Sequence, residues 1–219
     1  AAILLREHPG TTIVTDSITS TGLAKFIESK GGVHHRFKRG YRNVINESIR
    51  LNNLGQDSQL AIETSGHGAF KENYFLDDGA YIVTKLLIEL ARGKKEGYTL
   101  ESMIAELEEP AESKEFRMNI LVEDFKTYGQ QVIDQLNVYA ANQPGWSLAP
   151  NNFEGVRVNL DADHGDGWFL LRLSLHDPLL PLNIESNDVG GVKIIAKELA
   201  AFVANYDKLD SAKLQEFAK

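Results

Sequence analysis

The sequence predicts two consecutive layered domains, a three-layer α/β domain followed by a smaller α+β domain. Strand and helix patterns alternate through the first half, which is typical of helices covering a mixed, mostly parallel sheet. In the second half, closely spaced strand patterns are bracketed by helices, which favours an antiparallel sheet flanked by helices. The stretch Pro110–Ser113 has the character of a linker, so we expect domains over residues 1–112 and 113–219.

The first half contains three β-prone runs separated by amphipathic helical runs. Ser20 or Thr21 can cap the first helix, and the pair Gly31-Gly32 ends it. A later helix begins at Gly79, stops at Gly93 and carries its apolar residues on one side, namely Val83, Leu86, Leu87 and Leu90. The remaining expected elements are strands Thr12–Thr15, Val33–Phe37 and Leu60–Glu63, and helices Asn43–Leu51 and Leu100–Leu107.

The second half opens with an alternating strand and a long amphipathic helix. Three strand patterns follow a loop rich in Asn, Pro and Gly, and two helices close the chain. The expected strands are Phe116–Ile120, Val156–Leu160, Trp168–Leu173 and Leu182–Glu185, and the expected helices are Phe125–Tyr139, Val192–Val203 and Ser211–Phe217.

Composition excludes several classes of protein. The net charge of −8 argues against a nucleic-acid or anionic-membrane partner, and the absence of cysteine removes disulfides and thiolate metal sites. There is no apolar run of membrane-spanning length and no signal-peptide pattern, so we expect a cytoplasmic protein. Because the chain lacks an initiator Met and opens inside an apolar stretch, we interpret it as a piece of a longer protein.

Five residues that follow a predicted strand, Glu63-Thr64-Ser65-Gly66-His67, suit the binding of a sugar. A carboxylate accepts hydrogen bonds from vicinal hydroxyls, Ser65 donates or accepts, and His67 does either according to its tautomer. Gly66 allows close approach of the backbone or a positive φ. The alternative is an ordinary polar turn.

A second group of polar residues follows the apolar run that begins at Trp168. Arg172 and Ser174 are two residues apart and project to the same side of an extended strand, and His176 adds a possible donor. A guanidinium, a hydroxyl and loop amides can form a phosphate cradle. The alternative is a surface pair between Arg172 and Asp177 beside the turn at Pro178.

Gly40, Tyr41 and Arg42 belong to the single dense basic cluster of this acidic sequence, residues 38–42, which could line a cleft or form a solvated face. The hydroxyl-rich segment Thr15–Gly22 could bind an anion, but helix capping also explains its spacing and is the interpretation we prefer. The carboxylates of Asp161–Asp166 fit a polar β-hairpin turn better than a calcium loop, so we assign no metal site.

Several of these segments, in this order, resemble the third and fourth domains of the α-D-phosphohexomutase family, the phosphoglucomutases and phosphomannomutases. Glu63–His67 matches the family's Glu-X-Ser-Gly-His sugar loop, and Arg172–Pro178 is similar to its phosphate loop. The other similar segments are Thr12–Leu23, Phe37–Ile45, Asn73–Gly79 and Leu182–Glu185.

The resemblance implies the substrate-binding C-terminal half of an isomerase that moves a phosphoryl group between O1 and O6 of a hexose. It implies that Glu63, Ser65 and His67 hold the sugar, and that Arg172, Ser174 and His176 hold the phosphate that is not transferred. The family's phosphoserine and its Mg²⁺ site lie in earlier domains, so no catalytic nucleophile is expected in this chain. A hexose 1,6-bisphosphate is expected as activator and intermediate.

The sequence departs from the family pattern at three places. Leu175-His176-Asp177 fills the middle of the phosphate loop, where the family usually has Gly or Asn, then Thr. Ile18 stands near the position of a common lysine, and Tyr41 stands at that of a common histidine. A sugar-phosphate-binding protein that has lost catalysis therefore remains an alternative, as does an α/β pair with no ligand.

Overall fold

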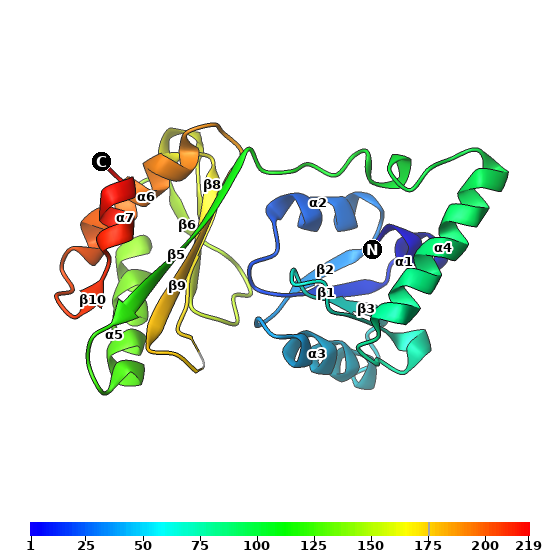
Figure 1. Ribbon diagram of the computed structural model, residues 1–219, viewed down its shortest axis with the longest axis horizontal. Coiled ribbons are helices and arrows are strands. Elements are labelled where there is room, and N and C mark those ends of the chain that lie inside the picture. The colour runs from blue at the N-terminus through cyan, green and yellow to red at the C-terminus, as the bar shows by residue number, and fades with distance from the viewer. Residues whose placement is uncertain (175) are drawn as a thin grey trace. The chain divides into compact units, whose positions relative to one another are not determined.

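The computed structural model describes residues 1–174 and 176–219, so Leu175 lies outside the described residues. The chain divides into two compact units, Ala1–Glu109 and Pro110–Lys219, whose elements are labelled in Figure 1. Neither unit contains a helix long and apolar enough to cross a membrane, among the residues that were described.

Unit 1 contains a four-stranded mixed sheet in the order β2-β1-β3-β4. β1 is parallel to β2 and to β3, whereas β4 is antiparallel to β3. The strands are β1 (Thr12–Thr15), β2 (Val33–Arg36), β3 (Ser58–Ile62) and β4 (Gly68–Phe70). The helices are α1 (Ala2–Glu7), α2 (Thr21–Ser29), α3 (Tyr41–Asn53) and α4 (Gly79–Glu96), with 3-10 turns at Lys71–Asn73 and Ser102–Ile104.

Two separate apolar cores lie on the two faces of this sheet. β1 shows the division, since Ile13 belongs to one core and Val14 to the other, as the alternation of side chains in a strand requires. Ile13 packs with residues of α1 and α2, and Val14 packs with residues of α3. This arrangement confirms the predicted three-layer α/β class with a mixed, mostly parallel sheet.

Helix α1 and strand β4 were not predicted, and two of the predicted helices of unit 1 differ from expectation. The predicted helix Leu100–Leu107 is only a 3-10 turn at Ser102–Ile104, although Thr99 and Ser102 exchange the reciprocal hydrogen bonds typical of a helix start. Helix α4 continues past Gly93 to a C-cap at Gly97, whose φ is +85°. Its apolar residues do share one side, but that side is exposed.

Unit 2 contains a six-stranded sheet in the order β10-β5-β9-β8-β7-β6, and every pair in it is antiparallel. The strands are β5 (Glu112–Ile120), β6 (Trp146–Leu148), β7 (Val156–Leu160), β8 (Gly167–Leu171), β9 (Leu179–Ser186) and β10 (Leu209–Asp210). The helices are α5 (Phe125–Ala140), α6 (Gly191–Val203) and α7 (Ala212–Phe217). The predicted α+β class is confirmed, although the short strands β6 and β10 were not predicted.

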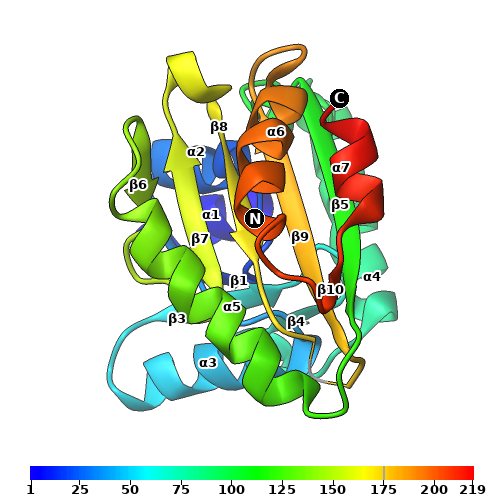
Figure 2. The same cartoon turned by 90° about the vertical axis from the view of Figure 1, so that its left-hand side faces the viewer.

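The helices of unit 2 share one core with one face of its sheet. Figure 2 shows α5, α6 and α7 in front of the strands, and residues of all three helices belong to the core that includes Val158, Phe169 and Leu182. The Asp161–Asp166 segment joins the antiparallel strands β7 and β8, as the hairpin interpretation predicts, and contains a 3-10 turn at Ala162–His164.

Candidate functional site

The predicted sugar loop, residues 63–67, is the turn between the antiparallel strands β3 and β4. The N–H of Glu63 donates to the carbonyl of His67 at 2.9 Å, and the N–H of Gly66 donates to the carbonyl of Glu63 at 2.9 Å. Gly66 has φ of +95°, a conformation that side-chain-bearing residues rarely adopt. The backbone of the loop is therefore closed by its own hydrogen bonds.

The carboxylate of Glu63 joins this loop to the N-terminus of α3. Its Oε1 accepts the backbone N–H of Gly40 at 3.0 Å, and its Oε2 accepts the hydroxyl of Ser65 at 2.8 Å. The guanidinium of Arg39 lies 4.0 Å from the same carboxylate. A carboxylate has about four lone-pair positions, so each oxygen keeps one for a sugar hydroxyl. Gly40 and Ser65, predicted separately, thus meet at one charged group.

Asp16 contacts the loop through the hydroxyl of Thr64. It was not identified as a site residue from the sequence. Its carboxylate lies just after β1, is fully buried, and accepts the hydroxyls of Thr64 at 2.7 Å and Thr19 at 2.8 Å. Burial raises the pKa of Asp16, because desolvation penalises the charged form. The available signal is the carboxylate in the hydroxyl-rich Thr15–Gly22 segment, whose spacing also fits helix capping.

The imidazole of His67 is held by an acidic and an aromatic partner. Its Nδ1 lies 2.7 Å from Oδ2 of Asp77, and the ring stacks on Tyr41 with centroids 5.0 Å apart and planes 24° from parallel. If Nδ1 carries the proton, the neutral ring presents Nε2 as an acceptor. The hydroxyl of Tyr41 accepts from Nε of Arg42 at 3.1 Å. Of the residues predicted as a possible cleft, Gly40 and Tyr41 therefore contact residues 63–67, and Arg42 contacts Tyr41.

The predicted phosphate residues of unit 2 lie at the tip of the β8–β9 hairpin. The N–H of Arg172 donates to the carbonyl of Pro181 and that of Ser174 to the carbonyl of Leu179, so the ladder continues beyond the strands. The Ser174 hydroxyl accepts the N–H of Asp177 at 3.2 Å, and His176 is exposed. The guanidinium of Arg172 lies 3.8 Å from the carboxylate of Glu154. The alternative interpretation had paired Arg172 with Asp177.

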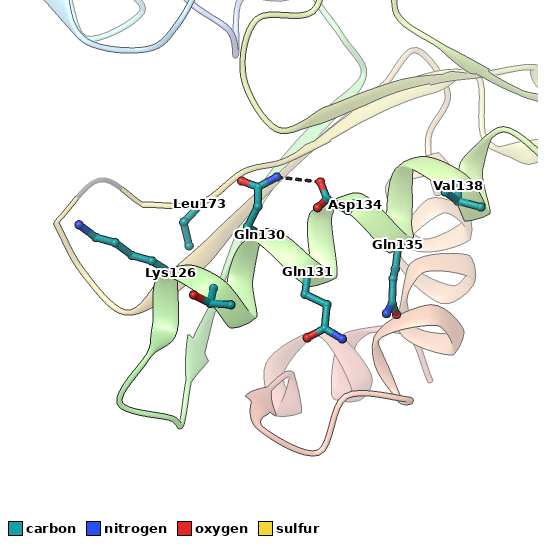
Figure 3. Close-up of a pocket in the computed structure, with 8 residues that line it drawn as sticks. Lys126, Gln130, Gln131, Asp134, Gln135, Val138 and Leu173 are labelled. Carbon is teal, nitrogen blue, oxygen red and sulfur yellow. Dashed lines mark hydrogen bonds between the residues drawn. The ribbon is translucent and has the colours of Figure 1, made fainter.

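A pocket of about 970 Å³ in unit 2 lies along α5 rather than over these residues. Figure 3 shows Lys126, Gln130, Asp134 and Val138 spaced along one side of the helix, with Leu173 entering from the hairpin tip. The side-chain amide Nε2 of Gln130 donates to Oδ1 of Asp134 at 2.8 Å, which engages part of that polar surface. Arg172 and Ser174 do not line the pocket, and we base the candidate site on the loops, where the charged groups converge.

The predicted site residues thus form one cluster in each unit. In unit 1, Glu63, Ser65 and His67 are in contact with Gly40 and Tyr41, and in unit 2 Arg172, Ser174 and His176 belong to one hairpin tip. Across residues 1–174 and 176–219, no group of three or more His, Asp or Glu side chains could hold a metal ion.

Comparisons with known proteins agree with the resemblance seen in the sequence. A sequence model described as phosphoglucomutase/phosphomannomutase, alpha/beta/alpha domain III, matches residues 1–110. A crystal structure of a phosphoglucomutase/phosphomannomutase family protein from Burkholderia thailandensis is similar with a TM-score of 0.72 and 26% identity, over 95% of this chain and 41% of that one. A search of the curated proteins finds no match.

Two structures of N-acetylphosphoglucosamine mutase from Aspergillus fumigatus share the fold. One, in complex with glucose 1,6-bisphosphate, has a TM-score of 0.53 and 12% identity, over 93% of this chain and 40% of that one. The other, with GlcNAc-6P and magnesium, has a TM-score of 0.51 and 11% identity over the same shares, 93% and 40%. This chain therefore spans about two fifths of the length of these structures. The chain belongs to the phosphoglucomutase/phosphomannomutase family, and its first unit matches the α/β/α domain III of that family.

Proposed function

We propose that this chain is the substrate-binding part of a phosphohexomutase that interconverts hexose 1-phosphate and hexose 6-phosphate through a bisphosphorylated intermediate. The observation that carries the proposal is the Glu63 carboxylate, which is fixed by Gly40 and Ser65 in a loop whose sequence resembles the family's sugar loop. A carboxylate held in this way is a rigid acceptor for two neighbouring hydroxyls. A cytoplasmic location stays a prediction from the sequence.

In this proposal the two loops bind the two ends of the substrate. Glu63 and Ser65 bind sugar hydroxyls, and His67, oriented by Asp77, lies beside them. Arg172, Ser174 and His176 bind the phosphate that stays in place, with the guanidinium as its principal charged donor. Holding both the sugar and the distal phosphate positions the other end for in-line phosphoryl transfer.

The phosphoryl carrier and the Mg²⁺ site are proposed to lie in earlier domains of a longer polypeptide. This proposal is supported by the length of the solved relatives, of which this chain covers about two fifths. The ion would supply charge neutralisation during transfer, a role that this chain's residues do not take. A hexose 1,6-bisphosphate is proposed as activator and intermediate, since a mutase of this family from Aspergillus fumigatus was crystallised with one.

Turnover by the intact parent protein tests this proposal. With Mg²⁺ and glucose 1,6-bisphosphate, we expect it to convert glucose 1-phosphate to glucose 6-phosphate, and we expect the 219-residue chain alone to bind glucose 6-phosphate without turnover. Binding is measured by calorimetry and turnover by a coupled assay. Binding without turnover of any hexose or hexosamine phosphate would establish the catalytically inactive alternative, which the altered residues around His176 favour.

A further inference from the structure

The first part of strand β5 forms an open edge of the sheet in unit 2. Only the last residues of β5 have a neighbour on that side, because β10 is two residues long and pairs with Asn119 and Ile120. Figure 2 shows β5 at the margin of the sheet, with α7 beside it. Among the described residues, no strand pairs with residues 113–117 on this side. We call residues 113–117 the β5 edge.

The hydrogen bonds at the end of β5 show which of its backbone groups face the open side. The N–H of Ile120 donates to the carbonyl of Pro178, on the side of β9, and the N–H of Leu121 donates to the carbonyl of Lys208, on the side of β10. Successive residues of a strand direct their N–H and C=O groups to opposite sides. Odd-numbered residues of β5 therefore point away from β9. Within the β5 edge these residues are Ser113, Glu115 and Arg117.

A hollow of about 570 Å³ follows the β5 edge. It is lined by four consecutive strand residues, Lys114–Arg117, and by three residues of α7, namely Lys213, Glu216 and Phe217. Consecutive side chains of a strand point to opposite faces of the sheet. A space that touches all four strand residues therefore lies along the edge itself and not over one face. This is the position that an added strand occupies when a peptide extends a sheet.

Positive charge gathers beside the β5 edge. The hollow is lined by three cationic and two anionic side chains, so it is net positive on a chain whose net charge is −8. The ammonium of Lys114 lies 4.5 Å from the centre of the Phe217 ring, and that ring packs on Phe116 with centroids 5.4 Å apart. Lys114 and Lys213 form no ion pair among the described residues. Their charges are therefore available to a carboxylate from outside.

We propose that the β5 edge is a docking site for an acidic, extended segment of a partner protein, which adds to the sheet of unit 2 as a further strand. The odd-numbered residues of the edge bind the backbone of that segment. Lys114 and Lys213 bind a carboxylate on the side of the added strand that faces α7. Because every pair in this sheet is antiparallel, we expect the added strand to run antiparallel to β5. The proposal concerns unit 2 and does not depend on the proposed mutase activity.

A second copy of this chain fits the β5 edge poorly. Two β5 strands that pair antiparallel about a two-fold axis place Glu115 opposite Glu115 when the pairing is centred on the edge, and like charges in direct opposition are destabilising. Moving the centre by one residue places either Lys114 opposite Lys114, or Ser113 opposite Asn119, where β10 already pairs. A separate acidic segment meets neither obstacle.

The alternative is an edge whose lysines only keep other strands away, as edge lysines often do. Such a protective edge binds neither acidic nor basic strands. A docking site for an acidic segment repels basic strands and binds acidic ones. The two interpretations therefore differ in what they predict for an acidic peptide.

Peptide binding to the 219-residue chain, followed by NMR through the backbone amide signals of the β5 edge, tests the proposal. The probe is acetyl-Val-Glu-Val-Glu-Val-amide, whose carboxylates share one face of a strand. One control peptide has Lys in place of Glu. The other is N-methylated at its Val residues, which removes the N–H groups that would donate to the β5 edge.

Two substitutions separate the backbone contact from the charge. Ser113→Pro removes one outward N–H and leaves the hydrogen bonds to β9, which the even-numbered residues make. Lys114→Glu reverses a charge beside the edge. Lys126→Glu, on the exposed surface of α5, is the matched control, since it makes the same change of charge elsewhere on unit 2. The dispersion of the amide spectrum shows that each variant is folded.

We expect the acidic peptide to bind and to shift the amide signals of the β5 edge. Lys114→Glu should weaken its binding at least about 10-fold, because attraction becomes repulsion. Ser113→Pro should weaken it at least about 3-fold, because one hydrogen-bond donor is lost. Lys126→Glu should bind the peptide as the native chain does.

Failure of the acidic peptide to bind, or equal binding of either control peptide, would overturn the proposal in favour of a protective edge. Equal losses for Lys114→Glu and Lys126→Glu would also overturn it, because the overall charge of the unit would then explain the binding. Shifts of the same amide signals on dilution of the chain alone would overturn it in favour of a second copy.

Discussion

The sugar loop of unit 1 and the hairpin tip of unit 2 differ in how they are supported. Residues 63–67 are braced from three other segments, through Gly40 to Glu63, Asp16 to Thr64 and Asp77 to His67. At the hairpin tip, the Ser174 hydroxyl bonds to Asp177 within the same turn, and His176 is exposed. One loop is pre-organised by distant contacts, and the other is shaped mainly by its own strand ladder.

The difference predicts how much each loop contributes to the affinity for the proposed sugar-phosphate substrate. A braced loop binds without a further cost of ordering its side chains, so truncating one of its central groups should be costly. Exposed side chains at a hairpin tip lose conformational freedom only when the ligand binds. A single substitution there should therefore reduce the affinity less than one in the braced loop. The charged Arg172, held near Glu154, is the exception within the tip.

The largest effect is expected for Glu63→Ala. The substitution removes the carboxylate that accepts two hydrogen bonds in the protein and is proposed to accept another from the sugar. We expect a loss of about 3 kcal/mol of binding free energy, or roughly 100-fold in affinity for glucose 6-phosphate. Ser174→Ala, which removes a hydroxyl from the hairpin tip, should cost roughly 3- to 10-fold. Calorimetry on the intact protein measures both. Equal losses would show that the two loops do not differ in the way proposed.

An intermediate effect is expected for Asp16→Ala, because the hydroxyls of Thr19 and Thr64 lose their acceptor. The free energy of unfolding of unit 1 should fall by roughly 1–3 kcal/mol, measured by amide hydrogen exchange in β1 and β3. Asp124→Ala removes the exposed N-cap of α5 and should cost unit 2 about 1 kcal/mol. Both Trp residues, Trp146 and Trp168, belong to unit 2, so their fluorescence reports that unit separately.

If Asp16→Ala leaves the hydrogen-exchange protection of β1 and β3 unchanged, the hydrogen bond from Thr64 to Asp16 contributes nothing measurable to the stability of unit 1. The conservative Thr64→Ser keeps the hydroxyl and should retain the affinity for glucose 6-phosphate, whereas Thr64→Val should weaken it. Equal affinities for Ser and Val at position 64 would show that the Asp16 contact does not position the loop.

The smallest effect concerns pH and belongs to unit 2. The carboxylate of Glu198 lies 2.8 Å from Nδ1 of His164 and raises the pKa of that imidazole. A raised folded pKa adds stability that is complete below the unfolded value near 6.5 and is lost as pH rises through the folded pKa. The pair is partly exposed, so the change should be under about 1 kcal/mol.

His164→Gln should flatten this part of the stability curve, measured by urea unfolding followed through Trp fluorescence. Glu198→Gln should flatten it too, while its amide oxygen can still accept the indole N–H of Trp146, which lies 2.8 Å from Glu198 in the native chain. A curve for either variant that keeps the native slope above pH ~6.5 would assign the pH dependence to other groups.

The elements most accurately predicted are those whose signals are local. Thr12–Thr15 coincides with β1, and the cap at Ser20 is present, with its hydroxyl accepting the N–H of Gly22. β4, β6 and β10 are two or three residues long, too short for alternation to be recognised, and they exist because a neighbouring strand pairs with them. The candidate site shows the same contrast between local and long-range signals. Glu63 and His67 belong to a contiguous motif that the sequence reveals, whereas the role of Asp16 depends on a contact with the distant Thr64.

By itself, the sequence determined the order of strands and helices, the class of each unit and the family, because periodicity, capping residues and the Glu63–His67 motif are properties of neighbouring residues. The tertiary structure decided which distant groups meet. Gly40 reaches Glu63 and Asp16 reaches Thr64 because the parallel strands β1, β2 and β3 end at the same edge of a sheet. It also decided that the apolar side of α4 faces outward, because Glu89 has its charged partner, Arg6, in a helix far away in the sequence.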